Sequence, residues 1–240
     1  MINFTEEIGF GQYKNVAIDL LKKTIDILNE FNINHFLISG TLLGQVRHND
    51  FIPWDDDIDL LVDETLIDKL DLISEKYSEI NLFKGTKYDS TKICFSDGME
   101  IPENENVIEW RKKAVKGDKY CWPFIDLFTY ELGPGIHSCG DYVDVLIDNK
   151  QQTKFFKPFG GHPNCMNNFR FFGKEKISFF HNEWNLSEFI PLNKVNFLGL
   201  EVNVPNNPRY FLELNYGNDY MIELKSTISH RTETINNNKL

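Results

Sequence analysis

Four aspartates in the first quarter of the chain have the types and spacing that best fit catalysis. They lie within Trp54–Leu60, where an acidic run leads into an apolar segment whose period-two alternation is typical of a β-strand. Asp57 and Asp59 are expected to point to the same side of this strand, with Cα atoms about 6.6 Å apart. Asp55 joins this face if the strand begins early. The opposite face is apolar and is expected to pack on the core: Ile58, Leu60 and Val62.

A further acid stands inside a second predicted strand. Asp126 interrupts the apolar run Phe124–Phe128, although aspartate is depleted in strands. If the two strands are neighbours, the carboxylates converge, and each like-charged pair about 4 Å apart costs about 4 kcal/mol at an effective dielectric constant near 20. Such a cluster has to take up protons or bind a hard cation. We therefore expect a Mg²⁺ or Mn²⁺ site on Asp55, Asp57, Asp59 and Asp126.

The acidic run has two other possible interpretations. An acidic run is usually a solvated surface, but this one is fused to an apolar strand and follows Phe51–Trp54, which disfavours free solvation. A calcium-binding loop of the D-x-D-x-D-G type does not fit either. Leu60 occupies its glycine position and Leu66 the position of its bidentate glutamate. A metal site is the interpretation that we favour.

A candidate phosphate-binding segment precedes the acidic run. A short predicted strand, 35–38, ends at Ser39, and Gly40 with Thr41 then opens a predicted helix over 41–48. The first turn of a helix presents free backbone N–H groups to an anion. Gly44 within this helix indicates a close approach, and Arg47 and His48 at its end offer positive charge. An ordinary turn followed by a solvated helix end is the competing interpretation.

The surrounding pattern predicts a mixed α+β fold, with a central sheet flanked by helices and an irregular C-terminal part. Predicted helices cover 13–31, 41–48 and the segment after Thr65, which we expect to be an N-cap. Predicted strands cover 35–38, 57–62, 81–84, 92–96 and 124–130. No element is predicted for 133–181, and an ordered block follows over 186–221.

Together these segments closely resemble the signature of the LicD family. The dense part of the resemblance is Ser39–Gly44, Arg47-His48 and Phe51–Leu60. Weaker similarity extends over most of 34–221, through these segments: Phe124–Phe128, Ile190–Leu192, Phe197–Leu200, Val204-Pro205 and Tyr216–Met221. The family includes bacterial phosphocholine transferases and, more distantly, fukutin-like proteins, and it belongs to the nucleotidyltransferase fold superfamily.

The resemblance implies roles for individual residues. Gly40 and Thr41 would lie at the donor phosphates, with Arg47 and His48 nearby. Catalytic carboxylates that hold the metal would be Asp57, Asp59 and Asp126, joined by Asp55.

The resemblance also implies an activity. Members of the family transfer a phospho-alcohol group, such as phosphocholine or phosphoribitol, from a CDP-activated donor to a sugar hydroxyl of a glycan and release CMP. Thr129–Glu131 departs from the family pattern, which leaves the acceptor unspecified. We expect one domain over 1–224, with a catalytic core at 34–130, an acceptor side at 131–224 and a polar tail at 225–240. The alternatives are a nucleotidyltransferase that releases pyrophosphate and a non-catalytic nucleotide- or glycan-binding protein.

Composition narrows the possible partners. A net charge of −11 disfavours binding to nucleic acid or anionic membranes. No secretory signal or apolar run long enough to span a membrane is evident, which favours a cytoplasmic protein. The basic stretch 111–119 is either an acceptor-binding loop or, as we favour slightly, an exposed face. The spacing of His137, Cys139, His162 and Cys165 fits no common zinc site. We therefore favour the interpretation that these are structural or incidental residues and not zinc ligands.

Overall fold

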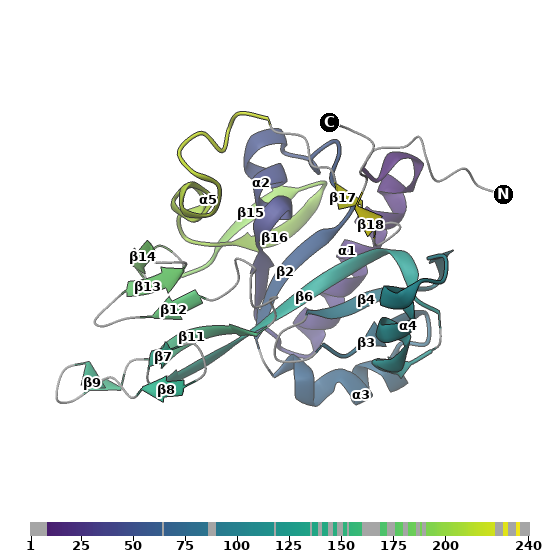
Figure 1. Ribbon diagram of the computed structural model, residues 1–240, viewed down its shortest axis with the longest axis horizontal. Coiled ribbons are helices and arrows are strands. Elements are labelled where there is room, and N and C mark those ends of the chain that lie inside the picture. Colours follow the sequence, from purple (N-terminus) through teal and green to yellow (C-terminus); the bar gives the residue numbers. More distant parts are fainter. Residues whose placement is uncertain are drawn as a thin grey trace.

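In the computed structural model, a mixed β-sheet forms the centre of the protein and helices cover it (Figure 1). The structure describes residues 9–63, 65–85, 90–117, 119–134 and 191–223, short strands between 136 and 185, Glu188, and two short strands beyond 223. The fold is α+β, as the sequence predicts. Among these residues no helix combines the length and the apolar character that crossing a bilayer requires.

The elements that form and cover the sheet alternate along the first half of the chain. The helices are the 3₁₀-helix η1 (Gly11–Tyr13), α1 (Lys14–Glu30), α2 (Ser39–His48), α3 (Leu66–Lys76), α4 (Glu105–Lys112) and α5 (Pro208–Tyr216). The sheet strands are β1 (His35–Leu37), β2 (Ile58–Asp63), β3 (Ile80–Phe83), β4 (Thr91–Glu100), β5 (Ala114–Lys116), β6 (Cys121–Pro134) and β11 (Lys154–Phe159).

The remaining strands are short and lie outside this sheet. They are β7 (Ile136–Ser138), β8 (Asp141–Val143), β9 (Leu146–Ile147), β10 (Gln151–Gln152), β12 (Phe169–Phe171), β13 (Lys176–Phe179), β14 (Asn182–Asn185), β15 (Asn193–Phe197), β16 (Leu200–Val204), β17 (Ile228–Ser229) and β18 (Thr234–Ile235). They pair in antiparallel hairpins, so the segment without predicted elements contains strands after all. Strands this short give too little periodicity to be identified from sequence.

The strand order brings two distant segments together. Six strands lie in the order β1-β2-β6-β4-β3-β5, and β11 pairs with the end of β6. Only β2 and β6 are parallel among the pairs of this sheet. A parallel pair requires a long crossover connection, which here contains α3, β3, β4, α4 and β5. As a result, the two acidic strands are neighbours at the centre of the sheet.

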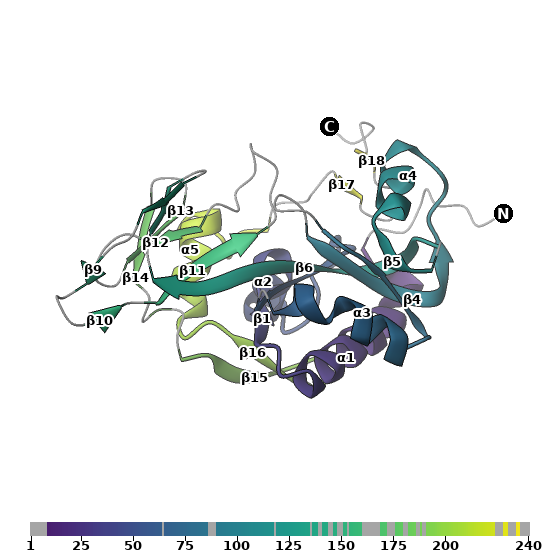
Figure 2. The same ribbon diagram turned by 90° about the horizontal axis from the view of Figure 1, so that it is seen from below.

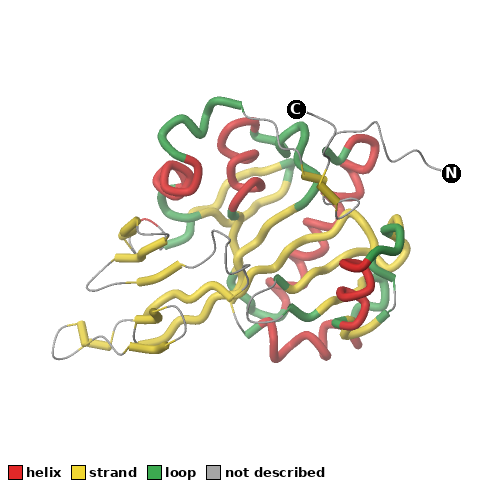
Figure 3. Tube along the Cα trace, in the orientation of Figure 1, coloured by secondary structure: helices red, strands yellow, loops and turns green. Residues whose placement is uncertain are grey.

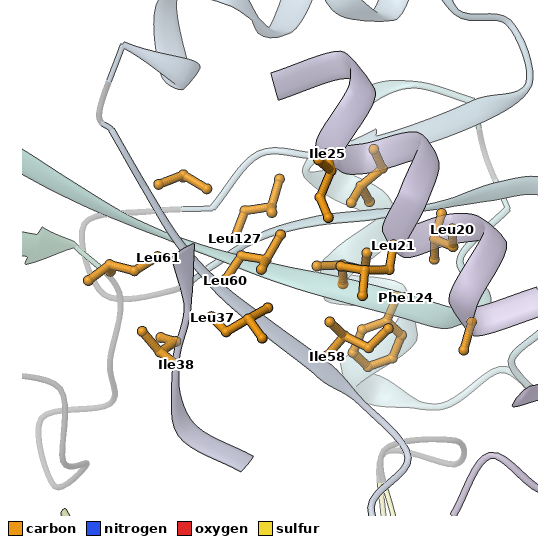
Figure 4. Packing of buried hydrophobic residues seen from close by; sticks show 14 of the residues in the cluster. Leu20, Leu21, Ile25, Leu37, Ile38, Ile58, Leu60, Leu61, Phe124 and Leu127 are labelled. Carbon is orange, nitrogen blue, oxygen red and sulfur yellow. The ribbon is translucent and has the colours of Figure 1, made fainter. Parts of the chain in front are cut away.

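Helix α1 determines which face of these strands is apolar. Apolar residues recur along it at helical spacing, and its buried side chains form one stripe. In Figure 4, Leu21 and Ile25 of α1 point toward the sheet. They face Ile58 and Leu60 of β2 and Leu127 of β6, all of which are fully buried. Each such side chain contributes about 1.5–3 kcal/mol through burial, so the packing on α1 fixes the opposite face as the acidic one.

The helices lie on both sides of the sheet. Figure 2 shows α1 and α3 on one side and α4 on the other. The β15–β16 hairpin packs beside β1, and α5 lies beside α2, an arrangement also visible in the tube of Figure 3. A hydrogen bond from the side-chain amide of Asn203 to the carbonyl oxygen of His35, 3.0 Å long, joins this C-terminal part to the sheet.

Local differences from the predicted elements have identifiable causes. Helix α2 begins at Ser39, two residues earlier than predicted, because Ser39 adopts a positive φ of 48° that turns the chain directly out of β1. Thr65 does occupy the N-cap position of α3, as predicted, but its hydroxyl makes no capping bond. The carboxylate of Asp63 instead accepts a hydrogen bond from the Thr65 backbone N–H at 2.9 Å.

The buried histidine of β1 makes stability depend on pH. Burial lowers the pKa of His35 below its usual 6.5, and the ring Nδ1 lies 3.0 Å from the carbonyl oxygen of Ile33. Below about pH 6.5 the unfolded chain takes up a proton that folded His35 resists, so the free energy of unfolding falls. In His35→Asn, which keeps a donor toward Ile33, we expect a smaller loss between about pH 7.5 and pH 5. Urea unfolding at both values measures this, and equal losses in the two proteins would contradict it.

Candidate active site

Three carboxylates from the two parallel strands meet on the acidic face. Asp57 immediately precedes β2, Asp59 lies within it, and Asp126 lies directly opposite Asp59 on β6. One oxygen from each lies within 4.8 Å of the other two. Oxygen donors at this spacing are suited to a hard divalent cation. The structure therefore groups three of the four predicted metal-binding aspartates and does not include Asp55 in this group.

Backbone contacts hold the acidic segment in place. The Thr41 hydroxyl in the first turn of α2 accepts a hydrogen bond from the backbone N–H of Asp59 at 2.8 Å. On the other side, the indole N–H of Trp122 donates to the carbonyl oxygen of Asp56 at 2.7 Å. Thr41, Trp122 and Asp56 are all buried. The acidic segment is thus fixed to α2 at one end and to β6 at the other.

Asp55 lies at the start of α2, beside the predicted phosphate-binding residues. A Cβ atom added at Gly40 would collide with the Oδ2 atom of Asp55, so a larger residue there would displace this carboxylate. A negative charge is favourable at a helix N-terminus because the first backbone N–H groups are unpaired within the helix. Gly40 and Asp55 therefore mark the place where an anion interacts with α2.

The close approach predicted at Gly44 is made by the chain itself. A Cβ atom there would lie 2.6 Å from the carbonyl oxygen of Asp50, in the loop that leads from α2 to the acidic run. Asn49, with a φ of 52°, ends the helix in the left-handed conformation and turns the chain back. Gly44 thus lets this loop pack against α2 and aligns the acidic run with the helix start.

Lys92 is a site residue that the sequence did not reveal. Its ammonium group lies 2.7 and 2.9 Å from the two carboxylate oxygens of Asp126, and the Ser90 hydroxyl donates to the same carboxylate. The side chains of Lys92 and Asp126 are only 8% and 7% exposed. A lone lysine in a predicted strand carries no signal of such a contact. Only the register of β4 against β6 shows it.

Arg47 and His48 at the end of α2 contact the C-terminal part. The guanidinium group of Arg47 donates to the carbonyl oxygens of Tyr220 at 3.0 Å and Ile222 at 3.4 Å. His48 lies 3.8 Å from the carboxylate of Glu223. These contacts connect residues 220–223, which follow α5, to α2.

Tyr216 brings a phenol to the acidic cluster from α5. Desolvation of its hydroxyl group, followed by the negative charges of Asp59, Asp55 and Asp57, raises the pKa of Tyr216 above its usual 10. The residue as a whole keeps 41% of its surface exposed. Tyr216 therefore remains a neutral hydrogen-bond donor near the acidic cluster. The Tyr-Gly pair in the family-like segment was the available sequence signal.

The basic stretch 111–119 is largely engaged within the protein. Arg111 pairs with Glu103 at 3.0 Å and also with Glu100, and Lys116 donates to the carbonyl oxygen of Ser74 at 2.9 Å. These contacts favour the interpretation of this stretch as an exposed face and not as an acceptor-binding loop. Of the four residues of the weighed zinc site, Cys139, His162 and Cys165 lie outside the described residues, and only the backbone of His137 is described.

Comparison with known families shows which family this chain belongs to. The family described as LicD/FKTN/FKRP, nucleotidyltransferase domain, matches residues 32–169, which contain the acidic run, Lys92 and Asp126. The chain belongs to the LicD family.

Individual relatives share parts of this LicD chain. The proteins called ribitol 5-phosphate transferase FKRP in human and in mouse are each 24% identical over 200 residues, covering 80% of this chain and 29% of the relative. Lipopolysaccharide cholinephosphotransferase LicD of Haemophilus influenzae is 42% identical over 55 residues, covering 23% of this chain and 21% of the relative. The chain thus matches less than a third of the length of these relatives.

The Thr41 hydroxyl should prove important for stability in this LicD domain. In Thr41→Val the buried N–H of Asp59 loses its acceptor, at a cost of about 1–3 kcal/mol. Thr41→Ser keeps the hydroxyl and removes only a methyl group, so it should be destabilised less. Urea unfolding of the three proteins gives the comparison, and equal free energies for Thr41→Val and wild type would contradict the assigned role.

Proposed function

We propose that the protein is a metal-dependent phosphotransferase that moves a phospho-alcohol group from a CDP-activated donor to a sugar hydroxyl and releases CMP. The convergence of Asp57, Asp59 and Asp126 carries this proposal, because phosphoryl transfer depends mainly on positioning and on stabilising negative charge. Membership of the LicD family and the functions named for its relatives support the class of reaction.

The three grouped carboxylates are the proposed metal ligands. Their oxygens lie within 4.8 Å of one another and match the ligand preference of Mg²⁺ or Mn²⁺. A divalent ion bound there would stabilise negative charge on the transferred phosphate and on the departing nucleotide. The hydrogen bonds of Thr41 and Trp122 to the backbone of the acidic segment keep the carboxylates in place before substrate binds.

The first turn of α2 is the proposed donor-phosphate end of the site. Gly40 and Thr41 provide backbone N–H groups there, and the helix dipole favours an anion. Arg47 and His48, in the last turn of α2, are proposed as further contacts to the donor phosphates, and their contacts with residues 220–223 also connect α2 to the C-terminal part.

Asp55 is the proposed acceptor of the proton from the attacking hydroxyl. Asp126 is the alternative, but its carboxylate already accepts hydrogen bonds from Ser90 and Lys92 to both oxygens, which uses most of its roughly four acceptor sites. Asp55 is not one of the three grouped carboxylates, and its Oδ2 atom lies against Gly40, next to the proposed phosphates. Tyr216 would face the incoming acceptor as a neutral donor.

We also propose one domain over residues 1–224, with a catalytic core at 34–130, an acceptor side at 131–224 and a polar tail at 225–240. The described C-terminal residues support this because they join the same buried cluster as the sheet. Phe197, Val202, Phe211 and Leu212 are each no more than 2% exposed within it.

A product assay tests the proposed reaction. CDP-choline, CDP-ribitol and CDP-glycerol are incubated with candidate glycans, and CMP is measured with and without Mg²⁺ or Mn²⁺. We expect CMP release that EDTA stops and divalent ions restore. Asp57→Asn and Asp59→Asn should each lower kcat by at least about 100-fold, the scale of losing one electrostatic stabiliser.

The exposed Asp71 of α3 provides a matched control, since Asp71→Asn makes the same chemical change away from the site. Its turnover should equal that of wild type. Release of pyrophosphate from nucleoside triphosphates in place of CMP would support the nucleotidyltransferase alternative. Near-wild-type turnover in Asp57→Asn would refute the assigned metal ligands.

The role of Asp55 can be separated from metal binding. In Asp55→Asn we expect kcat to fall by about 100-fold or more, in the range for loss of general base catalysis, and to lose its acidic pH dependence. The Mn²⁺ affinity should stay within about threefold of wild type, because the grouped carboxylates are intact. Mn²⁺ titration and a pH–rate profile measure both quantities. An unchanged pH profile would exclude Asp55 as the base.

A further inference from the structure

Lys92 lies in line with two of the grouped aspartates. Strand β6 stands between β2 and β4, and the register pairs Asp126 with Asp59 on one side and with Lys92 on the other. Directly paired residues project to the same face of a sheet. The row Asp59–Asp126–Lys92 therefore places an ammonium group at the edge of the proposed metal centre.

The position of this ammonium group is fixed by its surroundings. The Lys92 side chain is 8% exposed and bonds both oxygens of Asp126, at 2.7 and 2.9 Å. Its Nζ atom also lies 3.9 Å from the ring centroid of Phe124 and 5.0 Å from that of Trp110. Aromatic faces attract a cation, and a buried ammonium group needs such partners to offset its lost hydration. Lys92 thus places its ammonium group directly against the cluster.

We propose that Lys92 is a positioning residue that limits the acidic cluster to one divalent cation in the nucleotide-free protein. This inference rests on the metal centre of the proposed function. The three grouped carboxylates offer three negative charges, and Lys92 compensates one of them. The remaining charge matches a single divalent ion, whereas a second ion would have to lie close to the fixed ammonium group, which repels it. Lys92 also sets the orientation of the Asp126 carboxylate by bonding both of its oxygens.

This role differs measurably from a purely structural one. If Lys92 only supported the fold, its removal would weaken metal binding and turnover together. If it limits the charge of the cluster, its removal makes the cluster more negative, so cations bind more tightly while turnover falls through misplacement of Asp126. The opposite movement of the two quantities is therefore the signature of the proposed role.

Lys92→Met tests this directly, because methionine keeps an apolar stem beside Phe124 and Trp110 and removes the charge. Mn²⁺ is titrated into the nucleotide-free protein, and free Mn²⁺ is followed by electron paramagnetic resonance. We expect one ion per chain in wild type. In Lys92→Met we expect at least about tenfold tighter binding with a second ion, and at least about tenfold lower kcat. Lys92→Arg keeps the charge and should keep the stoichiometry of one.

A matched control and a further readout make the outcomes distinct. Lys113→Met removes a lysine that lies over the same Trp110 ring, 4.2 Å from its centroid, and stands outside the row. It should bind Mn²⁺ as wild type does. Thermal melting should show a larger stabilisation by Mn²⁺ in Lys92→Met than in wild type, because the ion replaces the missing charge. Unchanged or weaker binding in Lys92→Met would overturn the inference.

The number of Mn²⁺ ions bound per wild-type chain tests the inference even if Lys92→Met does not fold. Two Mn²⁺ ions bound to wild type without nucleotide would overturn the limiting role and leave the metal centre intact. The absence of Mn²⁺ binding from both wild type and Lys92→Met would instead refute the metal centre, and with it the metal dependence of the proposed function.

Discussion

Repulsion between carboxylates on two neighbouring parallel strands is the constraint on which the arrangement of the site depends. The register of β2 against β6 puts Asp59 directly beside Asp126, both less than a tenth exposed, with Asp57 close to them. Charges at this spacing are unfavourable unless positive charge is supplied. The chain supplies one such charge through Lys92. The other side of the cluster faces the start of α2 and Tyr216, where a divalent cation would supply the remaining positive charge.

The rest of the fold can be understood as support for this cluster. Packing on α1 commits one face of β2 to the core, so the aspartates have to occupy the other face. Thr41 and Trp122 then hold the acidic segment from both ends by bonding its backbone and leaving its carboxylates for other partners. The C-terminal part closes one side through α5 and through the contacts of Arg47. The site is thus assembled from segments that are far apart in the chain.

Agreement between the predicted and observed elements was best where the signal was local. The helical spacing over 13–31 and the strand patterns around 35–38 and 57–62 match α1, β1 and β2 closely. Agreement was poorest over 133–181, where short strands pair in hairpins whose stability comes from partners and not from periodicity. Asp126 was identified because an acid inside an apolar strand is unusual. Lys92 gave no comparable signal, and the signal for Tyr216 was limited to its place in the family-like segment Tyr216–Met221.

The sequence by itself determined the chemistry available to this protein: the acidic run fused to an apolar strand, the isolated Asp126, the glycine and threonine before a helix, and the family resemblance that they carry. These follow from residue types and short spacings, which act locally. The tertiary structure alone decided that β2 and β6 are parallel neighbours, that Asp55 lies against Gly40, and that Lys92 forms an ion pair with Asp126. Strand register and burial come from packing between distant segments, and no local pattern encodes which charge a buried lysine meets.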